Sequence, residues 1–237
     1  IWLGLVGSEM CIRDRLNTQV AEVDEDVIGE NHIGTSLNTP IRQDAFTLSD
    51  EQKIEEIQKN FRNIMDVLGL DLNDDSLSGT PQRVAKMYVK EFFKGLNPKN
   101  FPDIKLFENK YQYNEMLIEK NITLYSTCEH HFVPIIGKAH VAYISSGKVI
   151  GLSKINRVVE FFAKRPQVQE RLTKQIADSL KELLETDDVA ILIEATHLCV
   201  AARGIKDIQS STVTSEFSGA FKTERTQDKF LSLIKEI

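Results

Sequence analysis

Long hydrophobic runs, abundant cysteine and an excess of positive charge are all missing from this 237-residue chain. No apolar run approaches the roughly 18 residues that a membrane helix needs, so we predict no membrane partner. Three cysteines are too few for a disulfide framework. They favour a reducing, cytoplasmic setting in which thiols bind metal or take part in catalysis. The net charge of −6 argues against nucleic acid as a partner. A Gly-x-x-x-x-Gly-Lys-Ser/Thr loop is also absent, which excludes a P-loop GTPase.

The N-terminal part of the chain differs from the rest in composition. Residues 1–15 hold a short apolar stretch with no preceding basic residue, so they make a poor signal peptide. We expect them to be a non-native sequencing or translation artefact. Residues 16–46 contain six acids and one base and show no hydrophobic period. This composition is typical of a flexible acidic tail.

Two helices are predicted in the region 47–118. Ser49 and Gln52 have the spacing of a capping box, and apolar residues follow at helical spacing from Ile54 to Leu68. Thr80 and Pro81 are typical of an N-cap followed by the first helical residue, and we expect this second helix to stop at Gly95. We interpret 47–118 as an N-terminal helical region.

The pattern changes to strands in the region 119–237, which we expect to be catalytic. Strands are predicted at 122–128, 188–201 and 207–217, and a hairpin at 140–152. Two helices in series are predicted between them, the first capped by Ser153 and the second opened by Pro166. A short helix is expected to close the chain. This order predicts an α+β fold, with an antiparallel sheet and two helices packed on one face.

Two short segments gather most of the residues suited to metal chemistry. Cys128 and His131 have a spacing typical of metal sites, and Cys199 offers a third soft ligand. Three protein ligands leave one tetrahedral position open, which is typical of catalytic zinc. His130 and His197 would then lie beside the metal, where proton transfer is needed. Residues two apart on a strand face the same side, so His197 and Cys199 are expected to point together.

Two other interpretations of these residues remain open at this point. In the first, Cys128 and Cys199 are buried core thiols, and the histidines form hydrogen bonds to backbone carbonyls. A disulfide between the two cysteines would form in a metal-free, oxidised protein. The Cys-x-x-His spacing and the adjacent His197 favour the metal site over both.

Four segments resemble motifs of GTP cyclohydrolase I, in that family's order. They are Ser126-Thr-Cys-Glu-His-His-Phe132, Gly151-Leu-Ser-Lys-Ile-Asn-Arg157, Arg165-Pro-Gln-Val-Gln-Glu-Arg171 and His197-Leu-Cys-Val-Ala-Ala-Arg-Gly204. The resemblance covers roughly residue 47 to the C-terminus. It implies the conversion of GTP and water to 7,8-dihydroneopterin triphosphate and formate, the first step of tetrahydrofolate and other pterin biosynthesis.

The resemblance also implies roles for individual residues. Cys128, His131 and Cys199 correspond to the family's Zn²⁺ ligands, and His130 and His197 to its proton carriers. Glu170 corresponds to the residue that binds guanine N1–H and the 2-amino group, with Gln169 contributing nearby. Without the resemblance, Glu170 would be interpreted as an acid that stabilises the first turn of a helix.

A set of basic and hydroxyl residues matches the family's triphosphate contacts, although each basic residue alone is more typical of solvated surface. The set comprises Ser153, Lys154, Arg157, Arg203 and Arg83, with Lys206 a weaker member.

The family's architecture implies the tunnelling fold and an allosteric-type homodecamer of two stacked pentamers. Active sites would then lie between subunits, with Glu170 and Cys128 meeting across an interface, and a monomer would be inactive. Rival interpretations are a relative of the same fold acting on another pterin or deazapurine, and a non-catalytic, zinc-stabilised GTP- or pterin-binding regulatory protein. The two-cysteine site and the combination of His130, His197 and Glu170 favour the cyclohydrolase.

Overall fold

The computed structural model describes residues 36–235. The predicted artefact 1–15 and most of the predicted acidic tail, up to residue 35, lie outside the described residues. Every described helix and strand belongs to one unit, Asn38–Ile237. None of the helices between residues 36 and 235 has the length and apolar character needed to cross a bilayer.

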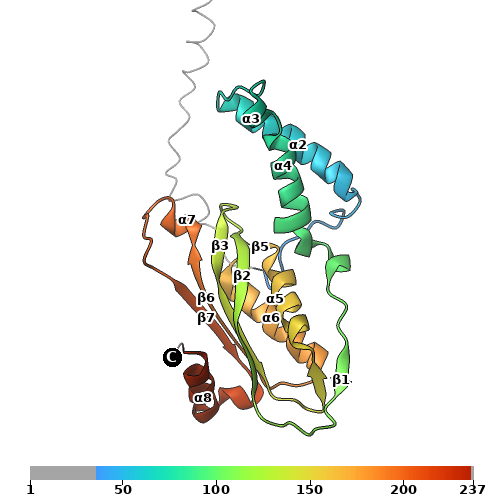
Figure 1. Ribbon diagram of the computed structural model, residues 1–237, viewed down its shortest axis with the longest axis vertical. Coiled ribbons are helices and arrows are strands. Elements are labelled where there is room, and N and C mark those ends of the chain that lie inside the picture. The colour runs from blue at the N-terminus through green and yellow to red at the C-terminus, as the bar shows by residue number, and fades with distance from the viewer. Residues whose placement is uncertain (1–35, 236–237) are drawn as a thin grey trace, which may run out of the picture. The chain divides into compact units, whose positions relative to one another are not determined.

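A helical segment comes first, drawn in blue and green in Figure 1. The Ser49 hydroxyl accepts from Gln52 N and the Gln52 side chain accepts from Ser49 N, so the predicted capping box is confirmed. Thr80 is the first helical residue, not the cap, which is Gly79. The elements are α2 (Asp50–Val67), α3 (Asp75–Ser78), α4 (Thr80–Met87), the π-helical η1 (Tyr88–Phe92), and the 3₁₀ turns η2 (Lys94–Leu96) and η3 (Pro98–Asn100).

The rest of the described residues, up to 235, form two sheets and four α-helices. Its elements are β1 (Leu106–Glu108), β2 (Leu117–Cys128), β3 (Pro134–Tyr143), β4 (Lys148–Ile150), α5 (Leu152–Ala163), β5 (Pro166–Gln167), α6 (Gln169–Leu184), β6 (Val189–His197), α7 (Leu198–Ala201), β7 (Thr212–Phe217), the 3₁₀ turn η4 (Gly219–Lys222) and α8 (Glu224–Ile234).

The main sheet has the strand order β5-β2-β3-β6-β7. All its neighbours pair antiparallel except β2 and β5, which are parallel, so the sheet is mixed and the predicted purely antiparallel sheet is wrong. The exception arises because Pro166–Gln167 does not open a helix as predicted. Its backbone pairs with Thr127 and Cys128, and α6 begins only after Val168.

Helices α5 and α6 lie along one face of this sheet, as Figure 1 shows. The main core forms there from alternate strand residues, such as Leu124, Ile135 and Ile193, packed against Ile155 and Leu172. A smaller apolar cluster forms at α8, near the C-terminus, where Phe230 packs on Ala142 and Ala190. The predicted α+β class with two helices on one face is therefore what the described residues form.

Three local predictions are wrong. Lys148–Ile150 pairs with Leu106–Glu108 in a separate two-stranded sheet, so no hairpin ladder forms at 140–152. Gly151, not Ser153, is the N-cap of α5. The strand predicted at 188–201 ends at His197, where the short helix α7 begins.

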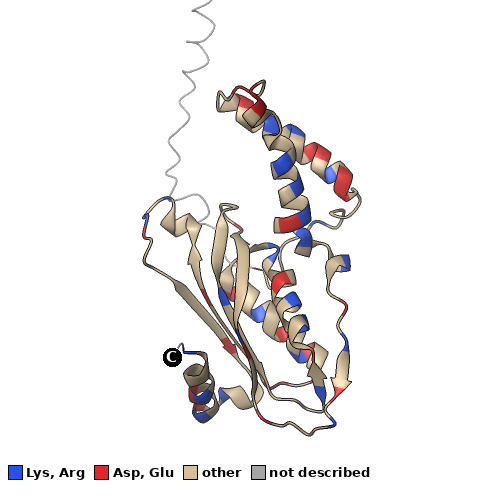
Figure 2. Ribbon diagram, viewed as in Figure 1, with Lys and Arg blue, Asp and Glu red and all other residues tan. Residues whose placement is uncertain are grey.

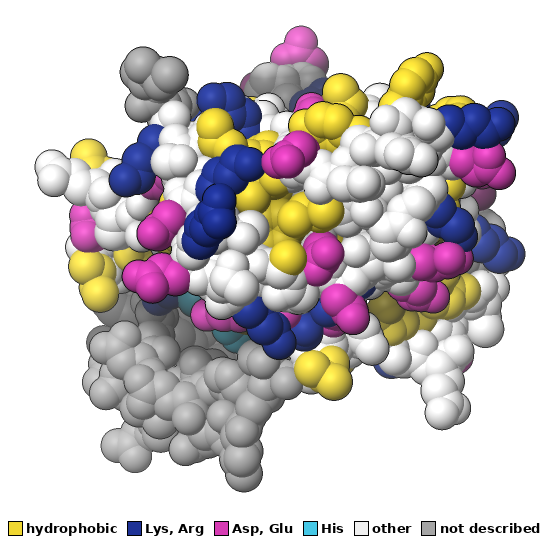
Figure 3. All heavy atoms as spheres, turned by 90° about the horizontal axis from the view of Figure 1, so that it is seen from below, with side chains coloured by type: hydrophobic (Ala, Val, Ile, Leu, Met, Phe, Trp, Pro, Cys, Tyr) yellow, Lys and Arg dark blue, Asp and Glu magenta, His cyan; other side chains and the backbone are white. Residues whose placement is uncertain are grey.

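Charged side chains of both signs are interspersed over the helices, as Figure 2 shows. This mixture agrees with a sequence whose net charge of −6 lies mostly in residues 16–46, which hold six acids and one base. The face in Figure 3 carries a group of apolar side chains bordered by charges of both signs. Exposed apolar groups of this kind are typical of surfaces that contact other molecules.

Candidate active site and metal centre

A tight turn at the end of β2 holds the first two candidate ligands. Cys128 N donates to Val133 O and Phe132 N donates to Cys128 O, both over 2.9 Å. Phe132 has a left-handed φ of 53°, uncommon for a bulky residue. Its ring packs on Phe93 at 5.1 Å between centroids. The segment after α4 thereby supports the turn, which brings the side chains of Cys128 and His131 together.

The third candidate ligand reaches the turn from α7. One ligand atom each from Cys128, His131 and Cys199 lies within 4.8 Å of the other two. Cys128 Sγ and His131 Nδ1 are 3.8 Å apart. A tetrahedral zinc with Zn–S of about 2.3 Å and Zn–N of about 2.0 Å would separate such atoms by about 3.5 Å. Two thiols and an imidazole therefore fit a zinc ion with one open position. Both cysteines are free, so they form no disulfide here.

The electrostatics of the three groups also suit a cation. Burial, followed by the neighbouring Cys128, raises the pKa of the Cys199 thiol to about 11. A divalent ion would supply the positive charge that two adjacent thiolates lack. Burial, then Arg203 and His130, lower the pKa of His131, which keeps the imidazole in the neutral form that ligates metal. Arg203 lies against this ring, with Nη1 2.6 Å from His131 Nε2.

His197 lies at the end of β6 on the face that packs against α6. Its Nε2 is 2.8 Å from Gln169 Oε1. The Gln169 amide nitrogen contacts three acceptors, Ile193 O, Thr212 O and the Thr214 hydroxyl, at 2.9–3.1 Å. Since that nitrogen is committed to acceptors, the Gln169 oxygen faces the ring and His197 Nε2 carries the proton. Nδ1 is then the basic nitrogen of the neutral imidazole.

Glu170 follows Gln169 in the first turn of α6 and is exposed. Burial lowers the pKa of His197, and the negative charge of Glu170 acts against this shift. The two side chains are thus close enough to interact electrostatically within one chain. The Gln169 side chain, in contrast, is 1% exposed and bonded to protein groups, so its predicted contribution to substrate binding stays a prediction.

The predicted triphosphate contacts are spread over several elements. Ser153 is exposed near the start of α5, and Lys154 donates to the Asp103 carbonyl. Arg157 lies one turn further along the helix and is exposed. Arg83 Nη2 donates to Ser76 O and the Thr80 hydroxyl, at 3.2 and 2.9 Å, within the α3–α4 segment. Arg203 is the member of the set that contacts the metal cluster.

An ion pair that sequence reasoning missed joins two of the motifs. Arg171 in α6 binds Glu129, the residue between Cys128 and His130. The segments that carry Glu170 and Cys128 therefore contact each other within one chain. That the Glu170 and Cys128 side chains meet across an interface stays a prediction. Both partners are charged residues within the motifs, but their spacing in the sequence does not indicate that they pair.

Comparisons with known proteins identify the family of this chain. The sequence profile of the GTP cyclohydrolase I family matches residues 57–235. The chain is 62% identical over 210 residues to GTP cyclohydrolase 1 of Flavobacterium johnsoniae, covering 89% of this chain and 94% of that protein. It is 56% identical over 200 residues to GTP cyclohydrolase 1 of Aeromonas salmonicida, covering 84% and 91%. The corresponding Yersinia enterocolitica protein is 51% identical over 211 residues, covering 89% and 95%. This chain belongs to the GTP cyclohydrolase I family.

Proposed function

We propose that this chain is a zinc-dependent hydrolase that converts GTP and water to 7,8-dihydroneopterin triphosphate and formate, the first step of tetrahydrofolate and pterin biosynthesis. The observation that carries the proposal is the convergence of Cys128, His131 and Cys199 in a chain of this family. Free thiols in the site also favour a cytoplasmic, reducing setting.

Zinc is the cofactor that the donor set fits, with Cys128, His131 and Cys199 as its ligands. When bound, zinc supplies a Lewis acid that lowers the pKa of water to about 7 and so provides a nucleophile for C8 of the purine at neutral pH. Two sulfur ligands and one nitrogen ligand make magnesium and calcium poor alternatives, because those ions prefer oxygen.

His197 and His130 are proposed to carry protons in the ring opening. The nitrogen that leaves C8 needs a proton, and an imidazole titrating near neutrality can deliver one. His197 is held through Nε2 by Gln169, so Nδ1 is the nitrogen free to exchange a proton with substrate. His130 is half-exposed beside the metal turn, with 48% of its side chain accessible. It is therefore reachable from solvent for the later proton transfers of sugar rearrangement and ring closure.

Glu170 is proposed to select guanine. A carboxylate accepts two N–H bonds, matching guanine N1–H and the 2-amino group, whereas adenine has an acceptor at N1 and no 2-amino group. The side chain is exposed at the first turn of α6 and interacts with His197. This arrangement would hold the purine with its imidazole ring toward the histidine.

The triphosphate contacts support active sites shared between subunits. Residues Ser153 and Lys154 lie at the start of α5, and the 12-residue helix ends beside the strand that pairs with Cys128. At 1.5 Å per residue, α5 separates these groups from the metal turn by about 18 Å. A neighbouring subunit could bring the start of its own α5 closer. We propose on this basis the tunnelling fold and the homodecamer that the family resemblance implies.

The face of the main sheet opposite α5 and α6, where α8 does not cover it, offers a surface for such assembly. Ile136 and Val213 point away from α5 and α6 and are 41% and 57% exposed. Burying them against another subunit would be favourable, since each buried apolar side chain contributes about 1.5–3 kcal/mol. The non-catalytic binding protein is not favoured, because a protein that only binds GTP has no need for an imidazole oriented by a buried amide.

Zinc-loaded protein incubated with GTP tests this function, with pterin followed by fluorescence and formate followed separately. We expect both products from wild type and neither from Cys199→Ala. Light scattering on the same sample should give a decamer, and an active monomer would contradict the shared sites. Formate without pterin would mean that the ring opens but a different product forms.

A further inference from the structure

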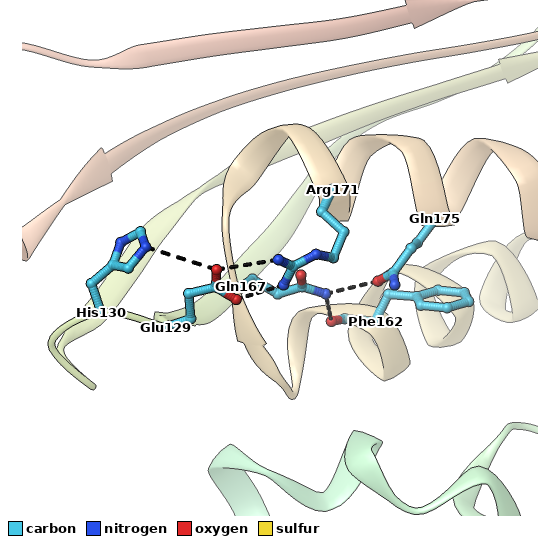
Figure 4. Close-up of polar contacts among 6 residues, drawn as sticks. All are labelled: Glu129, His130, Phe162, Gln167, Arg171 and Gln175. Carbon is cyan, nitrogen blue, oxygen red and sulfur yellow. Dashed lines mark hydrogen bonds and ion pairs between the residues drawn. The ribbon is translucent and has the colours of Figure 1, made fainter. Parts of the chain in front are cut away.

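A buried ion pair connects the metal turn to helix α6. Arg171 Nη1 is 2.5 Å from Glu129 Oε2, and Nη2 is 3.2 Å from Oε1, so the guanidinium binds the carboxylate through both oxygens (Figure 4). Only 3% of the Arg171 side chain and 17% of the Glu129 side chain are exposed. A bidentate contact of this kind fixes the relative orientation of the guanidinium and the carboxylate as well as their distance, because both groups are planar.

Each partner is adjacent in sequence to a residue proposed to bind metal or substrate. Glu129 follows Cys128 and precedes His130, and its Oε1 is 3.8 Å from His130 Nε2. In Figure 4 the ring of His130 and the guanidinium of Arg171 approach the same carboxylate from opposite sides. Arg171 follows Glu170 in the first turn of α6. The pair is thus the direct side-chain link between the segment that holds the metal turn and the segment that holds the guanine-binding residue.

Further hydrogen bonds fix the segments that carry Glu129 and Arg171. Glu129 N donates to Gln167 O over 3.1 Å, which extends the pairing of β2 with β5. The Gln167 side chain donates to Phe162 O and to Gln175 Oε1, both at 2.9 Å. Strand β5 is thereby fixed to α5 and α6, and Arg171 extends from that fixed base. The Glu129 carboxylate is thereby held by Arg171, whose helix is itself bonded to β5 through Gln167 and Gln175.

A gain in folding stability does not by itself explain this buried ion pair. Taking two charges out of water costs about as much as their attraction returns, and apolar replacements of buried pairs are often no less stable. Unlike apolar side chains, the ion pair imposes a defined geometry on the two segments. The Glu129 charge also faces the His130 ring and would hold its Nε2 side toward α6.

We propose that Glu129 and Arg171 are a positioning pair that sets the Cys128–His131 turn and the His130 ring against the first turn of α6. This inference rests on the proposed function, since the groups being positioned are those of the cyclohydrolase site. Neither residue touches the reacting atoms. Both act through His130 and the metal turn.

The test compares Glu129→Gln and Arg171→Lys with wild type and with Lys174→Gln. Lys174 is a matched control on the same helix, ion-paired with Asp178 and Glu216 but 45% exposed. The quantities measured are kcat per zinc-loaded chain and KM for GTP. For both test variants we expect kcat to fall roughly tenfold or more, a typical loss for an outer partner of a metal site, with KM within about threefold. Lys174→Gln should match wild type.

Normalising to zinc-loaded chains separates positioning from metal loss or misfolding. An unchanged kcat per loaded chain in both variants would overturn the proposal, whatever their thermal stability. A double variant, Glu129→Gln with Arg171→Lys, tests the pairing itself. We expect its loss in kcat to be no larger than that of the worse single variant, and additive losses would show that the residues act separately. Inactive wild type and inactive control would instead refute the proposed function.

Discussion

His197 donates a hydrogen bond from Nε2 to Gln169 Oε1 over 2.8 Å, and the Gln169 nitrogen is fully engaged with Ile193 O, Thr212 O and Thr214. A buried amide thus fixes both the direction and the tautomer of an imidazole proposed to exchange protons with substrate. The relationship links α6 to the ends of β6 and β7, so the fold itself orients the ring.

Replacing Gln169 with leucine should therefore impair His197. We expect kcat to fall about 10- to 100-fold, the loss typical of removing the partner that orients a site imidazole. The measurement is steady-state turnover of GTP in wild type, Gln169→Leu, His197→Ala and the double variant. If Gln169 acts through His197, the leucine substitution should cost little more in the His197→Ala background. An equal loss in both backgrounds would contradict this.

Removing one thiol should remove the metal. Cys128→Ala and Cys199→Ala are each expected to lower bound zinc from about one ion per chain to a small fraction, because two ligands cannot hold a catalytic zinc tightly. Zinc content after gel filtration gives the answer. Lys174→Gln, at a half-exposed residue of α6 outside the metal cluster, is the control and should retain the ion. Zinc retained by both site variants would rule out these ligands.

Glu170→Gln should weaken guanine selection. An amide presents only one acceptor oxygen, so one of the two N–H bonds from guanine is lost. We expect kcat/KM for GTP to fall at least about 100-fold and the preference for GTP over inosine triphosphate, which lacks the 2-amino group, to narrow. Glu182→Gln, an exposed acid on the same helix, should leave both quantities unchanged. An unaltered preference in Glu170→Gln would place guanine recognition elsewhere.

Gly95→Ala should destabilise the fold without touching the site. An added Cβ would lie 2.0 Å from Phe161 O and 2.8 Å from Lys164 O, so α5 would have to move. We expect a loss of about 1–3 kcal/mol in the free energy of unfolding, seen as a lower Tm. Gly151→Ala is the comparison, because its Cβ would meet nothing nearer than Lys154 Cγ at 3.8 Å. Equal Tm values for the two variants would contradict the packing argument.

Local signals in the sequence predicted the helices well. The capping box at Ser49 and Gln52 and the apolar stripe of α6 are short-range features, and both are present in the structure. The caps at Gly79 and Gly151 were misplaced by one or two residues, and two larger errors came from long-range pairing. Strand β4 pairs with β1, about forty residues earlier, and no local pattern indicates that partner. Pro166 is typical of the first residue of a helix, but in the structure its segment pairs with β2 as a strand.

The convergence of Cys128, His131 and Cys199 was predictable from ligand chemistry, although one step of the reasoning was wrong. Cys199 does not lie on a strand with His197. It reaches the cluster because α7 turns the chain back after β6 ends. The bond between Gln169 and His197 and the pair of Glu129 with Arg171 were not predictable, since they depend on how α6 docks on the sheet. Sequence spacing carries no information about that docking.

The most direct test of the account is the fate of C8 of GTP. Zinc-loaded protein would be given GTP labelled at C8, and labelled formate and pterin triphosphate would be quantified together in wild type, Cys199→Ala and His197→Ala. We predict equal amounts of the two products from wild type and neither from the variants. The contradicting result would be a label that stays in the nucleotide. The wild-type protein must in that case be shown to be assembled, zinc-loaded and able to bind GTP.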